Sequence, residues 1–120
     1  MARVDNYEQR FGGIGRLYGT DALTRLRQAH ICVIGIGGVG SWAVEALARS
    51  GVGKITMIDM DDICVTNINR QIHALTGNIG QLKTEVMQQR VKLINPECDI
   101  NVVDDFISAE NLSQYLRAEY

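Results

Sequence analysis

The feature that most constrains the fold is a glycine-rich turn, Gly35-Ile36-Gly37-Gly38-Val39-Gly40, which directly follows an apolar run. That run, His30-Ile31-Cys32-Val33-Ile34, is short and β-branched, as expected of a strand buried on both faces of a parallel sheet. The segment from Val39 to Arg49 has the pattern of a helix that ends at Gly51. A strand, a glycine turn and a helix in this order predict a βαβ unit whose helix N-terminus faces an anion.

The glycines of the turn have distinct physical roles. Gly35 permits a tight exit from the strand, and Gly37 lets the backbone approach a phosphate without a Cβ atom, while Gly40 lets helix and strand pack closely. Together with Gly38, these residues form the predicted phosphate-binding turn. A glycine pattern alone is a weak signal, so its surroundings decide its meaning.

A second strand strengthens the nucleotide interpretation. Lys54 to Ile58 is apolar and β-prone, and it delivers Asp59 to its carboxyl end, 19 residues after Gly40. That spacing is close to the one expected for a carboxylate that accepts a hydrogen bond from a ribose hydroxyl. We therefore predict a nucleotide-binding site at this end of the sheet.

The first part of the chain, residues 1–29, is predicted to be an arm that precedes the sheet. It contains four glycines that we expect to interrupt it: Gly12, Gly13, Gly15 and Gly19. One short helix is expected after Thr20 as N-cap, with Ala22, Leu23 and Leu26 on one face.

Residues 30–120 are predicted to form a Rossmann-like half domain of class α/β, with about three parallel strands in a three-layer arrangement. A helix from Gly80 to Asn95 is expected, and its apolar stripe predicts core packing: Leu82, Val86, Met87, Val91 and Ile94. A third strand is expected from Asp99 to Asp104, and a last helix near Ser108 as N-cap. The chain ends where a fourth strand would follow, which suggests a truncated chain, the first half of a doubly wound sheet.

Composition limits the class of protein. The chain of 120 residues is long enough for one domain, and it has no apolar stretch of transmembrane length and no secretory leader, so a cytoplasmic location is expected. Its three cysteines are widely spaced and form no C-x-x-C pair, which argues against a disulfide framework or a zinc site. A formal net charge of −2 is unlike a broadly basic nucleic-acid surface, so a polyanionic partner must be held locally.

Polar residues after the second strand distinguish one nucleotide from another. Asp59 and Asp61 are followed by Asn67, Arg70 and Lys83, groups that a nicotinamide dehydrogenase would not need. An enzyme that acts on ATP would use them, because an amide, a bidentate guanidinium and a mobile ammonium can all bind phosphate oxygens. The carboxylates would serve ribose and magnesium. The alternative is that these residues are solvated surface charges.

These motifs resemble the ubiquitin-activating-enzyme-like adenylylating family that includes MoeB, ThiF and HesA. The resemblance covers residues 22–104 and rests on the following segments: the glycine turn with Ser41, Ser50-Gly51-Val52-Gly53, Asp59-x-Asp61, Asn67-x-x-Arg70-Gln71, Gly80-x-x-Lys83 and Ile94-Asn95-Pro96. It implies that Asp59 binds the ATP ribose, that Asn67 and Arg70 bind the phosphates, and that Lys83 contacts them as an acyl adenylate forms. Magnesium would accompany the ATP.

Within the family, three segments look most like the tRNA threonylcarbamoyladenosine dehydratase branch: Arg10-Phe11-Gly12-Gly13, Arg16-Leu17-Tyr18-Gly19 and residues 64–75. That likeness implies ATP-dependent adenylylation of the carboxylate on the modified tRNA base, followed by ring closure and loss of AMP. It also implies a homodimer in which an arm arginine reaches the partner's ATP. The usual arginine is replaced by Gly13, so Arg10 or Arg16 is the candidate, with a solvated arm arginine as the alternative.

Two other functions remain open. An activator of a ubiquitin-like sulfur-carrier protein would share the adenylylation chemistry, and sulfur-transfer proteins would then be its partners. A non-catalytic nucleotide-binding or dimerisation module would bind ATP without turnover. A nicotinamide dehydrogenase is the least supported alternative.

Overall fold

The computed structural model describes residues 6–120. The chain contains five α-helices, three strands and two 3-10 turns within that range: α1 (Tyr7–Tyr18), α2 (Thr20–Gln28), β1 (His30–Ile34), α3 (Gly40–Arg49), β2 (Lys54–Ile58), η1 (Val65–Asn67), η2 (Thr76–Asn78), α4 (Lys83–Ile94), β3 (Asp99–Val103) and α5 (Leu112–Tyr115). The first two strands coincide with the predicted ranges. The third ends one residue earlier than expected, at Val103.

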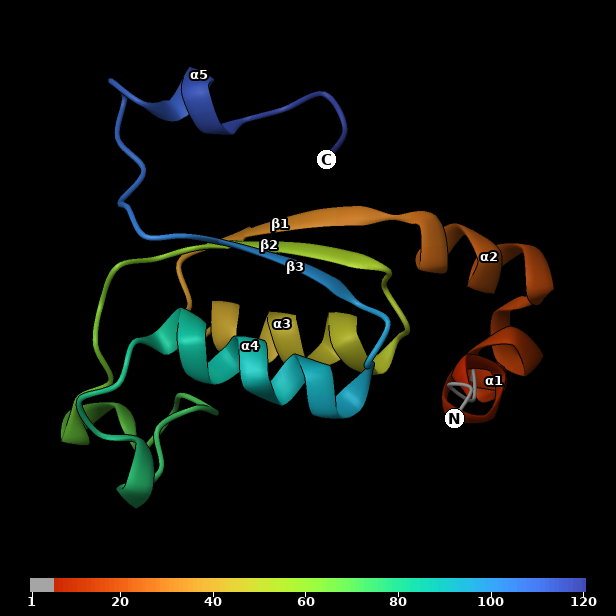
Figure 1. Ribbon diagram of the computed structural model, residues 1–120, viewed down its shortest axis with the longest axis horizontal. Helices are drawn as coiled ribbons and strands as arrows, with labels where there is room; N and C mark the ends of the chain where they lie inside the picture. The colour runs from red at the N-terminus through yellow and green to blue at the C-terminus, as the bar shows by residue number, and fades with distance from the viewer. Residues whose placement is uncertain (1–5) are drawn as a thin grey trace, which may run out of the picture.

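The three strands form one parallel sheet in the order β1-β2-β3. His30 pairs with Lys54 and Lys54 with Asp99, so all three strands start and end at the same two edges. Helices α3 and α4 form the two crossovers and lie side by side under one face of the sheet, whereas α5 lies beyond the opposite face (Figure 1). This arrangement confirms the predicted parallel α/β fold with helices before the sheet.

The main core lies between the sheet and helices α3 and α4. Its fully buried members are Ile36, Val44, Ala48, Val52, Ile55, Met57, Met87, Val91 and Cys98. The predicted apolar stripe of α4 is confirmed as core, since Met87 and Val91 are completely buried and Val86 nearly so. A second cluster of Tyr7, Phe11 and Leu23 packs α1 on α2, and the Tyr7 hydroxyl donates to the Gly51 carbonyl.

The prediction that glycines interrupt the arm is wrong at three of the four positions. Gly12, Gly13 and Gly15 lie inside α1, although a glycine in a helix interior is about 1 kcal/mol less favourable than alanine. Burial of apolar side chains on α1 offsets that preference, and Gly15 permits close contact with Leu23 of α2. Only Gly19, with φ of 99°, separates the two helices, and it replaces Thr20 as the N-cap residue of α2.

Two helix boundaries also differ from the sequence prediction. Helix α4 begins at Lys83 instead of Gly80. Gly80 has φ of 91°, which is not a helical conformation. Residues 80–82 instead pair with residues 62–63, where the Gly80 N–H donates to the Ile63 carbonyl and the Ile63 N–H donates to the Gln81 carbonyl. The last helix begins at Leu112, since the Ser108 N–H donates to the Asn111 side chain in a turn. Within residues 6–120, no helix has both the length and the apolarity that a membrane span requires.

Candidate functional site

A cavity of about 330 Å³ lies at the carboxyl ends of the three strands. The residues that line it are Ile34, Gly35, Gly37, Ile58, Asp59, Asp61, Lys83, Asp105, Phe106 and Ile107. They come from four separate segments: the turn after β1, the loop after β2, the start of α4 and the segment after β3. The parallel register brings these segments together, because all three strands end at this edge.

The glycine turn forms one wall of the cavity and has the geometry that its sequence predicts. Gly35 has φ of 83°, and its N–H donates to the Ile58 carbonyl at 2.9 Å. A Cβ atom at Gly40 would lie 1.7 Å from the Gly35 carbonyl oxygen, so only glycine permits this approach of α3 to β1. The N-terminus of α3 therefore follows the turn directly, as anion binding by a helix N-terminus requires.

Asp59 is buried and joins the turn to the loop after β2. Its Oδ2 accepts the Ile36 N–H at 2.7 Å, and its Oδ1 accepts the Asp61 N–H at 2.7 Å. A carboxylate that accepts one backbone bond on each oxygen keeps further acceptor capacity for a ligand. Asp59 thus both orders the cavity wall and presents a negative charge to it.

Lys83 supplies the positive charge of the cavity. It is the first residue of α4, its side chain is almost fully buried, and its Nζ lies 4.0 Å from Oδ2 of Asp61. The backbone N–H of Lys83 also donates to the Asp61 carbonyl at 3.1 Å. The structure therefore brings Asp59, Asp61 and Lys83 to one cavity with the glycine turn.

Asn67 and Arg70, two of the predicted phosphate ligands, are not among the residues that line the cavity. Asn67 is buried, and its Oδ1 accepts the Cys64 N–H at 2.8 Å, so the amide orders its own loop. The aliphatic part of the Arg70 side chain lies against Gly38, while Nη1 donates to the Thr66 carbonyl at 3.2 Å and to Oδ1 of Asn69 at 2.9 Å. Arg70 is thus next to the turn, with its guanidinium partly engaged by neighbouring residues.

Several side chains tie the loop that carries Arg70 to the glycine turn and α3. The Trp42 indole N–H donates to the Arg70 carbonyl at 2.8 Å, and Nε2 of His73 donates to the Ile36 carbonyl at 2.8 Å. The Ser41 hydroxyl accepts the Ile72 N–H at 3.3 Å. Burial, as the main cause, lowers the pKa of His73, so the imidazole is neutral at pH 7.

Two buried polar atoms point to incomplete hydrogen bonding near the turn. Oε1 of Gln71 and Nδ1 of His73 have no partner within residues 6–120. Gln71 is adjacent to the turn, with its Nε2 3.7 Å from the Cβ position of Gly37. Buried polar groups normally have partners, so these atoms are available to bound solvent or ligand.

The two arm arginines are not brought to this cavity within the chain. Nη1 of Arg10 donates to the Ile94 carbonyl at 3.2 Å, at the end of α4 opposite Lys83. Arg16 is exposed on α1 beside Gly12 and Gly13. Their action on the ATP of a second subunit stays a prediction.

The cavity suits a magnesium ion held by a nucleotide better than one held by protein alone. The described residues contain no cluster of three or more His, Cys, Asp and Glu side chains that could hold a metal. Magnesium commonly binds one or two carboxylates and completes its octahedron with phosphates and water. Asp61, exposed at the cavity edge, has the donor chemistry for that role.

Sequence reasoning missed the part of the site that follows β3. Asp105, Phe106 and Ile107 line the cavity, and none of them belongs to a motif. Their position directly beyond the carboxyl end of a parallel strand is the signal that could have identified them. Trp42 and His73 were missed for another reason, because their contacts arise only when the loop folds over α3.

The sequence is similar to one family of known proteins. Residues 13–119 match the model of the family described as the ThiF family. The chain is 77% identical to a tRNA threonylcarbamoyladenosine dehydratase of Haemophilus influenzae over all of its own length and 46% of that protein. It is 62% identical to the dehydratase of Escherichia coli over 97% of this chain and 43% of that protein. The chain therefore spans less than half the length of these curated relatives.

Solved structures of the Escherichia coli dehydratase have the same fold. The ATP complex of that enzyme has a TM-score of 0.95 at 60% identity, and the match covers all of this chain and 49% of that one. The AMP complex has a TM-score of 0.91 at 62% identity, with coverage of 96% of this chain and 47% of that one.

Proposed function

Because this chain belongs to the ThiF family, we propose that it holds the ATP site of an enzyme that dehydrates threonylcarbamoyladenosine in tRNA. The observation that carries the proposal is the single cavity that combines the glycine turn with Asp59 and Lys83. The named activity of relatives at 77% and 62% identity supports the choice of substrate. The ATP and AMP complexes of a structural neighbour support the choice of nucleotide.

The proposed ATP orientation follows from the polarity of the cavity. The phosphates lie on the turn at Gly35, Gly37 and Gly38, where the α3 dipole favours negative charge. The Gly35 N–H itself stays bonded to the Ile58 carbonyl. Asp59 accepts hydrogen bonds from the ribose hydroxyls. Lys83 and Arg70 bind the phosphate oxygens, with the Asn67 amide as a further donor.

The proposed reaction needs no nucleophile from the protein. The carboxylate of the modified base attacks the α-phosphorus, pyrophosphate leaves, and the carbamoyl group then closes a ring as AMP leaves. Arg70, Lys83 and the α3 N-terminus stabilise the negative charge that develops at the phosphoryl group. Magnesium, held by the phosphates and Asp61, would add further charge neutralisation.

Calorimetric titration with ATP and magnesium tests the nucleotide part of the proposal. We expect the chain to bind ATP and the Arg70→Ala variant to bind it at least tenfold more weakly, because a charge-assisted contact is worth about 1.5–3 kcal/mol. Arg25→Ala makes the same charge change on α2 and should leave the affinity unchanged. Preference for NADH over ATP would contradict the proposal.

AMP release with threonylcarbamoyl-modified tRNA tests the reaction. ATP-dependent loss of water from the modified base supports the dehydratase, whereas AMP release only with a ubiquitin-like sulfur carrier would support the other adenylylating function. Sulfur-carrier adenylyltransferases are among the relatives, at 34% identity for the Escherichia coli protein that acts on ThiS. Tight ATP binding with neither substrate turned over would indicate a nucleotide-binding module.

We also propose that the chain acts as a homodimer in the cytoplasm. Arg16 is the better candidate for a contact with the partner's ATP, because Arg10 is bonded to the carboxyl end of α4. Equilibrium sedimentation measures the oligomeric state. An Arg16→Ala subunit mixed with an Arg70→Ala subunit should regain ATP turnover only if the contact crosses the dimer.

A further inference from the structure

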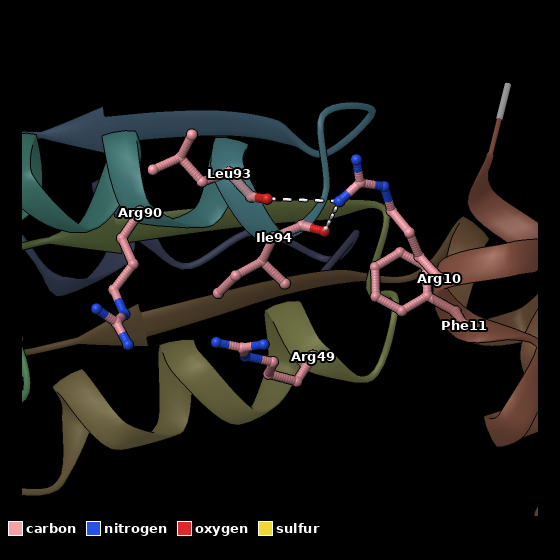
Figure 2. Close-up of a pocket in the computed structure, with 6 residues that line it drawn as sticks. All are labelled: Arg10, Phe11, Arg49, Arg90, Leu93 and Ile94. Atoms are coloured by element: carbon pink, nitrogen blue, oxygen red, sulfur yellow. Dashed lines mark hydrogen bonds between the residues drawn. The ribbon is translucent and has the colours of Figure 1, made fainter. Parts of the chain in front are cut away.

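We call the cavity beside the glycine turn the nucleotide cavity. A second cavity lies at the opposite end of helices α3 and α4, and Figure 2 shows its lining residues. Its volume is about 430 Å³, and six residues line it: Arg10, Phe11, Arg49, Arg90, Leu93 and Ile94. The three arginines come from α1, α3 and α4, so they lie far apart in the sequence. We call this space the arginine cavity. None of its residues lines the nucleotide cavity of the same chain.

Glu45 holds two of the three guanidinium groups in place. Nε and Nη2 of Arg90 donate to the two Glu45 oxygens at 2.6 and 3.1 Å, and Nε of Arg49 donates at 3.1 Å. These bonds, above all that from Arg90, lower the pKa of Glu45, so its carboxylate is ionised at neutral pH. The guanidiniums of Arg49 and Arg90 are directed toward each other between the two helices (Figure 2).

The arginines keep donors for a ligand. Each guanidinium has five N–H donors, and Nη1 of Arg49 and Nη1 of Arg90 have no hydrogen-bond or ion-pair partner within residues 6–120. Nη1 of Arg10 donates to the carbonyls of Leu93 and Ile94, as drawn in Figure 2. Guanidinium groups that are already oriented lose less entropy when they bind an anion.

Charge makes the arginine cavity unusual for this chain. Three arginines line it, and the ion pairs of two of them are with one carboxylate, Glu45, whereas the whole chain has a formal net charge of −2. Arg49 is also accessible, with 62% of its side chain exposed. Planar guanidinium donors match the oxygens of a phosphodiester, and positive charge gathered in one place can hold a polyanion on an acidic protein.

We propose that the arginine cavity binds backbone phosphates of the RNA whose modified base enters the nucleotide cavity. This inference rests on the proposed function. Arg90 lies seven positions after Lys83 in α4, which is about 10 Å along the helix. Neighbouring charges on one nucleic-acid strand are roughly 3.4 Å apart along the axis. Phosphates a few nucleotides from the reacting base can therefore reach Arg49 and Arg90.

Fluorescence anisotropy with labelled threonylcarbamoyl-modified tRNA tests the proposal at several salt concentrations. We expect Arg49→Ala to weaken binding roughly fivefold at 0.15 M salt and to lower the slope of log K against log salt by about 0.9, the loss of one phosphate contact. ATP affinity should not change, because Arg49 is outside the ATP site. Arg25→Ala, the same charge change on α2, should alter neither quantity.

A second variant is expected to change RNA affinity in the opposite direction. Glu45→Gln removes the negative charge of the cavity and keeps the side-chain shape, so RNA binding should tighten by a similar factor. Thermal unfolding of both variants checks that the fold persists. If the arginines had only a structural role, Glu45→Gln would not tighten RNA binding.

Four results would overturn the proposal. The first is RNA binding with unchanged affinity and salt slope in both variants. The second is absence of RNA binding by the unmodified chain. That result would leave the proposed ATP site intact if the unmodified chain bound ATP and Arg70→Ala abolished this binding. The third is that Arg49→Ala weakens binding of a polyglutamate peptide but not of RNA. The fourth is that it weakens binding of inorganic phosphate alone but not of RNA.

Discussion

The two ends of helices α3 and α4 form cavities of opposite construction. At the end near the carboxyl edge of the sheet, Asp59 and Lys83 are more than nine-tenths buried and line a cavity with the glycine turn. At the other end, the charged groups are side chains such as Arg49, which is 62% exposed. Buried groups define one ligand geometry, whereas exposed cations attract anions over a wider range of positions.

The difference also concerns how each cavity depends on the rest of the fold. The nucleotide cavity is part of the hydrogen-bonded sheet, through Gly35 N to Ile58 O and Asp59 N to Val103 O. In the arginine cavity, Arg49 and Arg90 are held by ion pairs with a single residue, Glu45. Substitutions in the nucleotide cavity should therefore change stability and ATP affinity together. Substitutions in the arginine cavity should change only anion binding and its salt dependence.

The largest expected effect is at Gly40. Alanine there would place a Cβ atom 1.7 Å from the Gly35 carbonyl, so α3 must move away from β1, and we expect Gly40→Ala to lower the free energy of unfolding by about 3 kcal/mol or more and to abolish ATP binding. Urea unfolding measures the loss. Gly77→Ala, where no atom lies within 4 Å of the new Cβ, should change stability by less than about 1 kcal/mol. Equal effects of the two variants would contradict the tight turn.

A substitution at Lys83 tests whether ATP binds at the Lys83 end of the two helices and not at the Arg49 end. Lys83→Met keeps the length and apolar contacts of the side chain and removes its charge. We expect ATP affinity to fall about 100-fold, near 2.7 kcal/mol, because the cation is almost fully buried at the phosphate site. Calorimetry measures this change, and Arg49→Ala is the matched control. Similar losses in both variants would show that the two ends do not differ in ATP binding.

The pH dependence of stability should reflect the nucleotide end. Burial lowers the pKa of His73, so the unfolded chain binds a proton more readily than the folded one below pH 6.5. The stabilisation is present above that pH and is lost as pH falls from 6.5 toward the folded pKa, with a slope of at most about 1.4 kcal/mol per pH unit. Burial also lowers the pKa of His30, which contributes in the same direction.

Urea unfolding at pH 7.5, 6.5 and 5.5 measures this dependence. His73→Gln should reduce the slope and leave only the contribution of His30. Glu45, whose pKa is lowered instead, contributes stability that is lost only below its ordinary pKa of 4.5. A slope that is unchanged in His73→Gln would rule out His73 as a source.

The smallest expected effect is at Trp42. Trp42→Phe removes the indole donor to the Arg70 carbonyl but keeps an aromatic ring, so the loop that carries Arg70 should be less ordered. We expect ATP affinity to fall about fivefold, corresponding to roughly 1 kcal/mol for one hydrogen bond. Tyr18→Phe, which removes a hydroxyl from an exposed ring on α1 away from the cavity, is the control. An affinity equal to that of the unmodified chain would show that this hydrogen bond does not order Arg70.

Predictions from sequence succeeded where local geometry decides structure. The strands His30–Ile34 and Lys54–Ile58 and the helix after the glycine turn follow from apolar runs, β-branching and glycine positions. The arm failed because glycine content suggested interruption, whereas contacts of Tyr7 and Phe11 with distant residues stabilise α1. Tertiary contacts of this kind routinely override local propensity.

The sequence by itself determined the strand, turn and helix around Gly35 and the close approach at Gly40, since each depends on the conformational limits of neighbouring residues. The order of the strands in the sheet was decided by the tertiary structure. Only the tertiary structure decided that Phe106 completes the nucleotide cavity and that Arg10, Arg49 and Arg90 share another. The physical reason is that these residues carry no local pattern and meet only because the sheet register and the packing of three helices place them together.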